Sequence, residues 1–353
     1  MDDLDRIRQA FELACAARGR TLPNPSVGAV VWDARGKPVA RAATGPSGRP
    51  HAERQALDGA RKAADGGTMA VTLEPCVAFP GKTSPPCAAA LILSGVERVI
   101  VGCEDPNPLV RGKGIHALRR AGIQVDVLDP DGRIADFYAG FGLWLATKRP
   151  RVTLKVALSA DGNANPAPGV RGAITSDVAR TFVHRLRSVS DAVLVGASTL
   201  SIDNPRLTVR DVPGPSPRPL VLAGSGPVPT VRTLWSDPRT VVLGPRRPEG
   251  LPPGIAFAPV ASEEGRVDLG AILDLCGAEG IHDLLVEPGP KLLSAFLSAG
   301  LWDRLWVLRS PVAQPGGTPF DAQGLLPAEE PAETLALGED TATRWERPAL
   351  SST

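Results

Sequence analysis

The chain has 353 residues and nearly balanced charge, with 39 Lys and Arg residues against 38 Asp and Glu residues. This length predicts two domains, and the balanced charge argues against nucleic acid as the main partner. Hydrophobic residues form 43% of the chain, which supports folded cores and excludes a fibre or a disordered chain.

Strands and helices alternate in the first part of the chain. A helical face at the amino terminus precedes predicted strands at 27–32, 39–43, 69–73, 98–102 and 124–128, and predicted helices at 51–64, after Pro86, at 115–121 and at 134–147. Such alternation is typical of a layered, mostly parallel α/β domain. We assign this first domain to residues 1–147.

The same pattern begins again after Pro150. Predicted strands lie at 152–159, 192–195, 219–223, 240–243, 283–286 and 304–309, and predicted helices at 177–188, 269–277 and 291–299. The segment 161–172, rich in Gly, Pro and Asn, and the segment 196–210 are predicted to be loops. Residues 148–353 are therefore predicted to form a second α/β domain.

Several features of the sequence indicate where the protein works. No stretch approaches the 18 apolar residues of a membrane-spanning helix, and the charged segment 1–20 lacks the apolar core of a signal peptide. The five cysteines are too few and too scattered for a disulfide framework. We therefore expect a cytoplasmic protein without a membrane partner.

The strongest chemical signal combines one histidine, one glutamate and two cysteines. His51 lies two residues before Glu53, and Cys76 follows a proline, with ten residues between Cys76 and Cys87. One imidazole and two thiolates suit Zn²⁺ and leave its fourth position open, as in catalytic zinc sites. A glutamate two residues after the histidine matches the general acid/base of zinc base deaminases.

Each of these residues also has an ordinary interpretation. A lone His-Ala-Glu on a helix is usually a surface feature, and unpaired cysteines are usually core residues. Their joint occurrence where strands meet helices favours the metal site. Cys15, Cys103 and Cys276 are expected to pack as small hydrophobic residues.

Two ordered series of motifs resemble the bifunctional riboflavin-biosynthesis deaminase/reductase family. The first half contains LPNPSVGAV at 22–30, HAERQAL at 51–57, TLEPC at 72–76, GKTSPPC at 81–87 and CEDPNPLVRGKG at 103–114. The second half contains RVTLKVALSADG at 151–162, ITS at 174–176, DAVLVGAST at 191–199, DNPRLTVR at 203–210 and LLVEPG at 284–289. The resemblance covers nearly the whole chain.

For the first half, the resemblance implies a cytidine-deaminase-like domain of three layers. Its reaction would be hydrolytic removal of the 2-amino group of 2,5-diamino-6-ribosylamino-4(3H)-pyrimidinone 5′-phosphate. Zinc would bind His51, Cys76 and Cys87, with Glu53 as general acid/base and Asn24 in the substrate pocket. Between the two cysteines, where the family has a histidine pair, the segment 77–81 contains none, and we expect this change to affect substrate binding more than zinc binding.

For the second half, the resemblance implies a dihydrofolate-reductase-like α/β domain. This domain would use NADPH to reduce the ribosyl group to ribityl. Implied cofactor-binding residues are Ala157, Thr199, Asp203, Gly289 and Lys291. Implied substrate-binding residues are Arg171, Arg187, Leu207, Arg210 and Glu287. Where the family has serine and tryptophan, this chain has Arg171 and Ala173.

Two alternatives to a bifunctional enzyme remain open from the sequence. One half could be inactive and serve as an assembly scaffold, or the first half could deaminate a different base or nucleoside. Zinc content and NADPH affinity would distinguish the scaffold from the bifunctional enzyme. We expect a small-molecule substrate, a pyrimidine ribotide, and a homo-oligomer, because enzymes of this kind are commonly symmetric oligomers.

Overall fold

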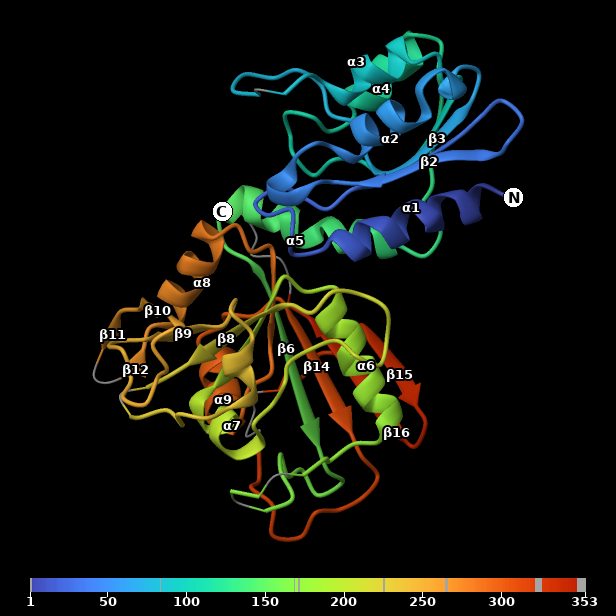
Figure 1. The fold of residues 1–353 in the computed structure, drawn as a ribbon. Helices are drawn as coiled ribbons and strands as arrows, with labels where there is room; N and C mark the ends of the chain where they lie inside the picture. Colours follow the sequence, from blue (N-terminus) through green and yellow to red (C-terminus); the bar gives the residue numbers. More distant parts are fainter. Residues whose placement is uncertain are drawn as a thin grey trace. The chain divides into compact units, whose positions relative to one another are not determined.

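The computed structural model describes residues 2–82, 84–167, 169–170, 172–224, 226–263, 266–320 and 326–347. The chain divides into two compact units, Met1–Lys148 and Arg149–Thr353 (Figure 1). Each unit contains its own sheet with its own helices. Among the described residues, no helix has both the length and the apolar content that crossing a membrane requires.

The amino-terminal unit is built on a five-stranded sheet in the order β2-β1-β3-β4-β5. Strand β1 runs antiparallel to its neighbours β2 and β3, whereas β3, β4 and β5 are parallel. The strands are β1 (Gly28–Trp32), β2 (Pro38–Ala43), β3 (Thr68–Leu73), β4 (Arg98–Cys103) and β5 (Gln124–Val127). Every strand predicted in this half lies within a few residues of its observed position.

Helices cover both faces of this sheet, which gives the unit three layers. In Figure 1, α1 and α5 lie on one face and α2, α3 and α4 on the other. Their bounds are α1 (Asp3–Ala17), α2 (Ala52–Ala60), α3 (Cys87–Leu93), α4 (Lys113–Arg120) and α5 (Arg133–Thr147). Short 3₁₀ turns occupy Pro46–Gly48 and Arg61–Ala64.

Close packing of α1 on the sheet depends on a glycine. A Cβ atom added to Gly28 would lie 1.9 Å from the Ala10 carbonyl oxygen, so only glycine allows this approach of strand and helix. All five residues of β1 are buried. Phe11 of α1 and Phe137 of α5 meet edge to face, with ring centroids 5.4 Å apart, so the two helices pack against each other as well as against the sheet.

The carboxyl-terminal unit is built on a nine-stranded sheet in the order β10-β9-β8-β7-β13-β6-β14-β16-β15. The strands from β10 to β14 in this order are parallel, and β16 and β15 add antiparallel pairs at one edge. The bounds are β6 (Arg151–Leu158), β7 (Ala192–Gly196), β8 (Arg218–Leu222), β9 (Val241–Gly244), β10 (Ala256–Pro259), β13 (Asp283–Val286), β14 (Arg304–Arg309), β15 (Glu333–Leu337) and β16 (Asp340–Glu346). A separate pair, β11 (Ser262–Glu263) and β12 (Arg266–Val267), is antiparallel.

The helices of this unit are α6 (Asp177–Ser188), α7 (Ala197–Asp203), α8 (Leu269–Ala278) and α9 (Pro290–Ser298), with a 3₁₀ turn at Thr233–Ser236. Residues 196–210, predicted to be a loop, contain α7, so that prediction is wrong in part. Leu200 of α7 is fully buried in a core cluster with strands β7 and β8. One buried side chain in a seven-residue helix is too weak a periodic signal to identify a helix from sequence.

Helix α6 separates an apolar face from a polar one. Ala179, Phe182 and Val183 pack in a core cluster with residues of β14, β15 and β16. Arg180, His184 and Arg187 follow one another at helical spacing on the other face. This polar face provides part of the second candidate site.

Candidate active sites

In the amino-terminal unit, the ends of three elements bring His51, Cys76 and Cys87 together. His51 is the residue before α2, Cys76 follows β3, and Cys87 begins α3. The His51 Nδ1 atom lies 3.3 Å from the Cys87 Sγ atom and 3.7 Å from the Cys76 Sγ atom. One ligand atom from each of the three residues lies within 4.8 Å of the others.

Each of these three side chains changes the pKa of another. Hydrogen bonding from Cys87, and also from His51, lowers the pKa of Cys76 to about 3. The Cys76 thiolate in turn raises the pKa of His51, and raises that of Cys87 well above its usual range. A negative sulfur beside an imidazole and a second thiol is a donor set that a soft or borderline divalent cation stabilises.

Glu53 lies in the first turn of α2 and is almost fully buried, with 3% of its surface exposed. Burial raises the pKa of Glu53, and the nearby Cys76 adds to this effect. A carboxyl group with a raised pKa can both release and accept a proton near neutral pH. Glu53 is therefore a buried carboxyl group with a raised pKa in the same region as His51, Cys76 and Cys87.

A second buried glutamate organises the loop at residues 105–115 next to this cluster. One oxygen of Glu74 accepts hydrogen bonds from the amides of Asp105 (3.1 Å) and Gly112 (2.8 Å), and the other from those of Gly114 (2.7 Å) and Ile115 (3.1 Å). Glu74 was not predicted as a site residue, although it lies two residues before Cys76. Its role depends on amides 31 to 41 residues away, which no local pattern reveals.

Two further features of the first half lie in loops. Asn24 is half-buried before β1, and its carboxamide approaches the Ser47 carbonyl oxygen at 3.5 Å. A Cβ atom on Gly48 would lie 2.0 Å from the Asn24 side chain, so Gly48 leaves room for this asparagine. In the altered segment between the cysteines, the Lys82 ammonium lies 5.6 Å from the Phe79 ring centroid.

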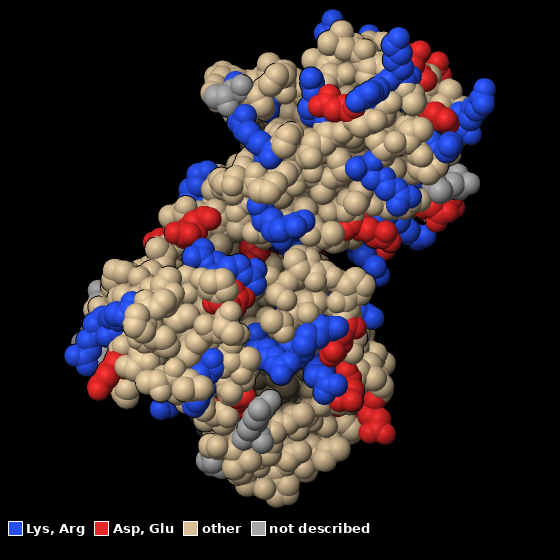
Figure 2. Space-filling view, viewed as in Figure 1, with Lys and Arg blue, Asp and Glu red and all other residues tan. Residues whose placement is uncertain are grey.

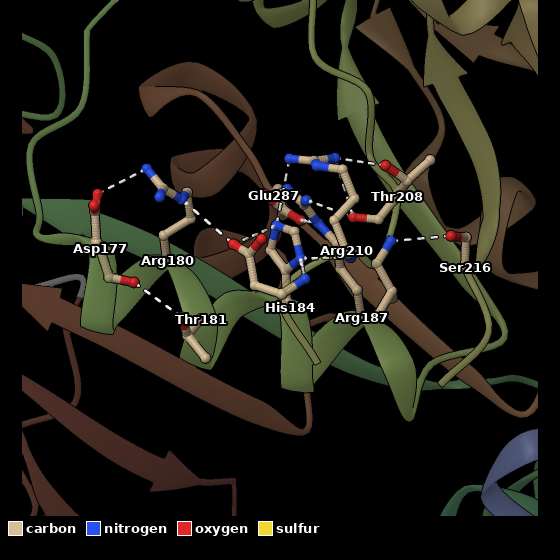
Figure 3. Close-up of polar contacts among 11 residues, drawn as sticks. Asp177, Arg180, Thr181, His184, Arg187, Thr208, Arg210, Ser216 and Glu287 are labelled. Carbon is tan, nitrogen blue, oxygen red and sulfur yellow. Dashed lines mark hydrogen bonds and ion pairs between the residues drawn. The ribbon is translucent and has the colours of Figure 1, made fainter. Parts of the chain in front are cut away.

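In the carboxyl-terminal unit, a buried acid sits between two bases. The Arg187 guanidinium donates to both oxygens of Glu287, at 2.6 and 2.9 Å (Figure 3). The Lys155 Nζ atom lies 3.5 Å from one of these oxygens. Burial alone would raise the pKa of Glu287, but Arg187 and Lys155 outweigh it and lower this pKa to about 2. Lys155 was not predicted as a site residue; its only sequence signal is a charge inside an apolar strand.

The segment 204–211, which we call the strap, brings Leu207 and Arg210 to the same region. Leu207 is 2% exposed and has a φ of 53°, a left-handed conformation that costs energy for leucine. Arg187 donates to the Thr208 carbonyl oxygen at 3.3 Å, and Arg210 donates to the Thr208 Oγ1 atom at 2.5 Å. Two of the arginines predicted to bind substrate, Arg187 and Arg210, therefore meet at Thr208, as Figure 3 shows.

The residues predicted to bind the cofactor gather where β7 and β13 end. These two strands are parallel neighbours, so α7 and α9, which follow them, begin at the same edge of the sheet. A Cβ atom on Gly289 would lie 3.7 Å from the Thr199 Oγ1 atom. Lys291 lies in the first turn of α9 and Asp203 ends α7.

The remaining predicted residues of the second half lie in or after β6. Ala157 is half-buried on β6, opposite Leu308 of β14. Arg171 lies outside the described residues. Ala173, which stands where the family has tryptophan, is exposed.

This architecture defines a zinc-binding deaminase domain joined in one chain to a reductase domain, and comparisons with known proteins agree with both halves. Residues 2–103 match the family described as the cytidine and deoxycytidylate deaminase zinc-binding region. Residues 150–343 match the family described as the RibD C-terminal domain.

Similarity to individual proteins extends along the whole chain. The riboflavin biosynthesis protein RibD of Aquifex aeolicus is 36% identical over 98% of both chains. The solved structure of RibD from Acinetobacter baumannii is 32% identical, with a TM-score of 0.76 over 98% of both chains. The diaminohydroxyphosphoribosylaminopyrimidine deaminase/5-amino-6-(5-phosphoribosylamino)uracil reductase of Thermotoga maritima is 31% identical, with a TM-score of 0.78 over 97% of both chains.

The chain belongs to the RibD family of bifunctional deaminase/reductases of riboflavin biosynthesis. This confirms the resemblance seen in the sequence motifs, the predicted fold class of both halves, and zinc and NADPH as cofactors. The role of each individual site residue remains a prediction.

Proposed function

We propose that the chain catalyses two reactions of one pyrimidine ribotide. The amino-terminal unit deaminates 2,5-diamino-6-ribosylamino-4(3H)-pyrimidinone 5′-phosphate, and the carboxyl-terminal unit reduces the ribosyl group of the product to ribityl with NADPH. The observation that carries this proposal is the convergence of His51, Cys76 and Cys87 beside the buried Glu53. The family and the activities in the name of the Thermotoga maritima protein support the substrate and the second reaction.

In the first reaction, His51, Cys76 and Cys87 would hold zinc, which their donor atoms and spacing fit. When bound, zinc supplies the Lewis acidity that lowers the pKa of water to near 7. Glu53 takes a proton from the water and returns it to the amino group that leaves as ammonia. The raised pKa of Glu53, caused mainly by burial, suits both proton transfers.

The arginines of the second site suit a phosphate group. Arg210 is exposed on the strap, and Arg187 lies beneath it in contact with the same threonine. A guanidinium fork binds phosphate oxygens in pairs. Glu287 and Leu207 would contact the sugar and ring next to this phosphate, and Arg171 would add a further cation. In the first site, Asn24 would bind the substrate of the deamination.

NADPH, when bound, supplies the hydride, and the chain provides its position. Gly289 leaves the Thr199 hydroxyl close to the backbone, and the free amides at the start of α9 favour an anion such as a cofactor phosphate. Lys291 in the same turn adds positive charge. Asp203 and Ala157 would contact other parts of the cofactor.

We also propose that the protein works in the cytoplasm as a homo-oligomer and without nucleic acid. The formal net charge is +1, and basic and acidic side chains are interspersed on the face shown in Figure 2. A nucleic-acid surface would instead present a basic stripe. Light scattering would show the oligomeric state, and gel-shift titration with single-stranded DNA and RNA would show no binding at physiological salt.

Mass spectrometry of the ribotide, incubated with zinc-loaded protein with and without NADPH, tests the two activities. Deamination adds about 1 Da, and reduction adds about 2 Da more. We expect the first change with zinc alone and the second only with NADPH. A first change without the second would leave a deaminase joined to a scaffold, and no change with zinc bound would mean that the segment 77–81 has altered the substrate.

A further inference from the structure

His184 is a buried histidine on the polar face of α6, next to the predicted phosphate-binding arginines. Only 1% of its side chain is exposed. No motif in the sequence analysis drew attention to it, and the proposed function does not use it. Its surroundings nevertheless place it at the base of the strap (Figure 3).

The hydrogen bonds of His184 define its protonation state. Its Nδ1 atom accepts from the backbone amides of Arg210, at 2.9 Å, and of Asp211, at 3.1 Å. Because amides only donate, Nδ1 carries no proton and the proton of the neutral ring is on Nε2. The Nε2 atom lies 3.7 Å from the Asp211 carboxylate and 3.5 Å from the Arg210 guanidinium. One ring nitrogen thus holds two consecutive amides of the strap.

Among the described residues, other side chains contact the strap at positions on both sides of Arg210, and Arg180 donates to the Asp211 carboxylate at 3.5 Å. Ser216 Oγ accepts from the Val209 amide at 2.9 Å, and Arg187 donates to the Thr208 carbonyl oxygen. Leu207, in its left-handed conformation, requires such fixed points to stay in place. At Arg210 itself, the backbone hydrogen bond is the one to His184.

We propose that His184 is a positioning residue of the reductase site: its neutral ring fixes the strap so that Arg210 is held ready to bind the substrate phosphate, and protonation of the ring at Nδ1 releases Arg210. This inference rests on the proposed reductase function. It assigns a role to a residue that does not touch the substrate, and it predicts that substrate affinity falls in acid.

The charges around His184 support the neutral state. Burial lowers its pKa, and the Arg187 and Arg210 guanidinium groups lower it further, against the opposing effect of the Asp211 and Glu287 carboxylates. Because the pKa is lowered from the ordinary histidine value of 6.5, the neutral ring predominates at and above that pH. The hydrogen bonds to the strap are therefore present there, and are lost as the pH falls through the lowered pKa.

Two substitutions distinguish the loss of the hydrogen-bond acceptor at position 184 from the loss of a side chain that titrates. In His184→Asn, the amide oxygen occupies about the position of Nδ1 and accepts hydrogen bonds at every pH. In His184→Leu, the size is similar but the acceptor is lost. We expect His184→Leu to raise the KM of the reductase for the aminouracil ribotide about tenfold, the equivalent of about 1.4 kcal/mol, with a much smaller change in kcat. His184→Asn should restore most of the affinity.

The pH profile gives the second readout. From about pH 8 to about pH 5, the wild-type KM should rise more steeply than that of His184→Asn. The substrate phosphate also titrates near pH 6, but it does so equally for both proteins, so the ratio of the two KM values isolates His184. His116→Asn, an exposed histidine in the other unit, is the matched control and should follow the wild-type profile.

Hydrogen exchange tests the inference without any activity. In wild type the amides of Arg210 and Asp211 should lose protection in acid, relative to neighbouring amides; in His184→Asn they should keep it, and in His184→Leu they should lack it throughout. Equal KM values for wild type and His184→Leu, or equal protection at Arg210, would overturn the proposal. Absence of reductase activity in the wild type would instead refute the proposed function and leave the exchange result to decide the role of His184.

Discussion

The centre of the amino-terminal unit gathers three metal-binding side chains around one another, whereas the centre of the carboxyl-terminal unit pairs an acid with two bases. At the first centre, the lowered pKa of Cys76 favours a thiolate beside His51 and Cys87, and a cation would stabilise this negative charge. At the second, Arg187 and Lys155 already neutralise the buried Glu287. Burying a charge is costly unless a partner compensates it.

The two centres therefore rely on different components. In the proposed mechanism, the first depends on a metal ion and on proton transfer by Glu53, and the second depends on an ion pair between side chains of the protein itself. Because each centre is enclosed in its own unit, a change that disables one should leave the other active. Each unit can therefore serve as the internal control for the other.

Removal of zinc should have the largest effect. A chelator should abolish deamination, because it withdraws the group that His51, Cys76 and Cys87 are arranged to hold, and should leave NADPH-dependent reduction of the aminouracil ribotide unchanged. Product masses before and after chelation, and again after zinc is restored, measure this. A parallel loss of reduction would contradict the independence of the two centres.

Glu53→Gln should be next in size. The amide cannot carry a proton, so we expect the deamination rate to fall about 10²- to 10⁴-fold while zinc content stays the same. Ammonia release measures the rate, and metal analysis of the purified protein confirms zinc binding. Asp58→Asn, an exposed carboxylate on the same helix, is the matched control and should keep the wild-type rate; equal rates for both variants would remove Glu53 from the mechanism.

Arg187→Met applies the same test to the second centre. It leaves the buried Glu287 with Lys155 as its remaining ion-pair partner, and breaking a buried pair in this way typically costs about 3 to 5 kcal/mol. We expect loss of reductase activity and faster hydrogen exchange in β6 and β13, with deamination retained. Arg185→Met removes an exposed arginine from the same helix and should change neither; equal effects of the two variants would show that general helix damage, not the ion pair, is responsible.

The sequence predicted the elements that recur with clear periodicity and the residues that carry chemistry in short motifs. The strands β1, β3, β4, β6, β7 and β13 were found close to their observed bounds. The edge strand β15 and its neighbour β16 were missed, because half-exposed strands mix polar and apolar residues irregularly. The helix α7 was missed because its one buried side chain, Leu200, is too weak a signal to show helical periodicity.

The parts of the sites that escaped prediction share a physical reason. Glu74 and His184 act by accepting hydrogen bonds from amides that are remote in sequence. Such contacts depend on how a loop folds back on a helix or strand, and neither partner has a distinctive local pattern. Lys155 joins Glu287 across 132 positions of the sequence, and the sheet order that brings them together follows from the whole fold.

The smallest expected effect is on the stability of the carboxyl-terminal unit in acid. It distinguishes the contribution of the Glu287 ion pair from that of other carboxylates. The pKa of Glu287 is lowered from 4.5 to about 2. The stability that this ion pair contributes is therefore present above pH 4.5 and is lost as the pH falls toward 2. This shift corresponds to about 3 kcal/mol in the free energy of unfolding. In Arg187→Met the pKa of Glu287 is held down less, so the free energy of unfolding of the carboxyl-terminal unit should fall less over this window. Hydrogen exchange of β13 at several pH values measures this slope in both proteins. Equal slopes would mean that other carboxylates cause the acid sensitivity. The stability of the second centre would then not depend on the ion pair between Arg187 and Glu287.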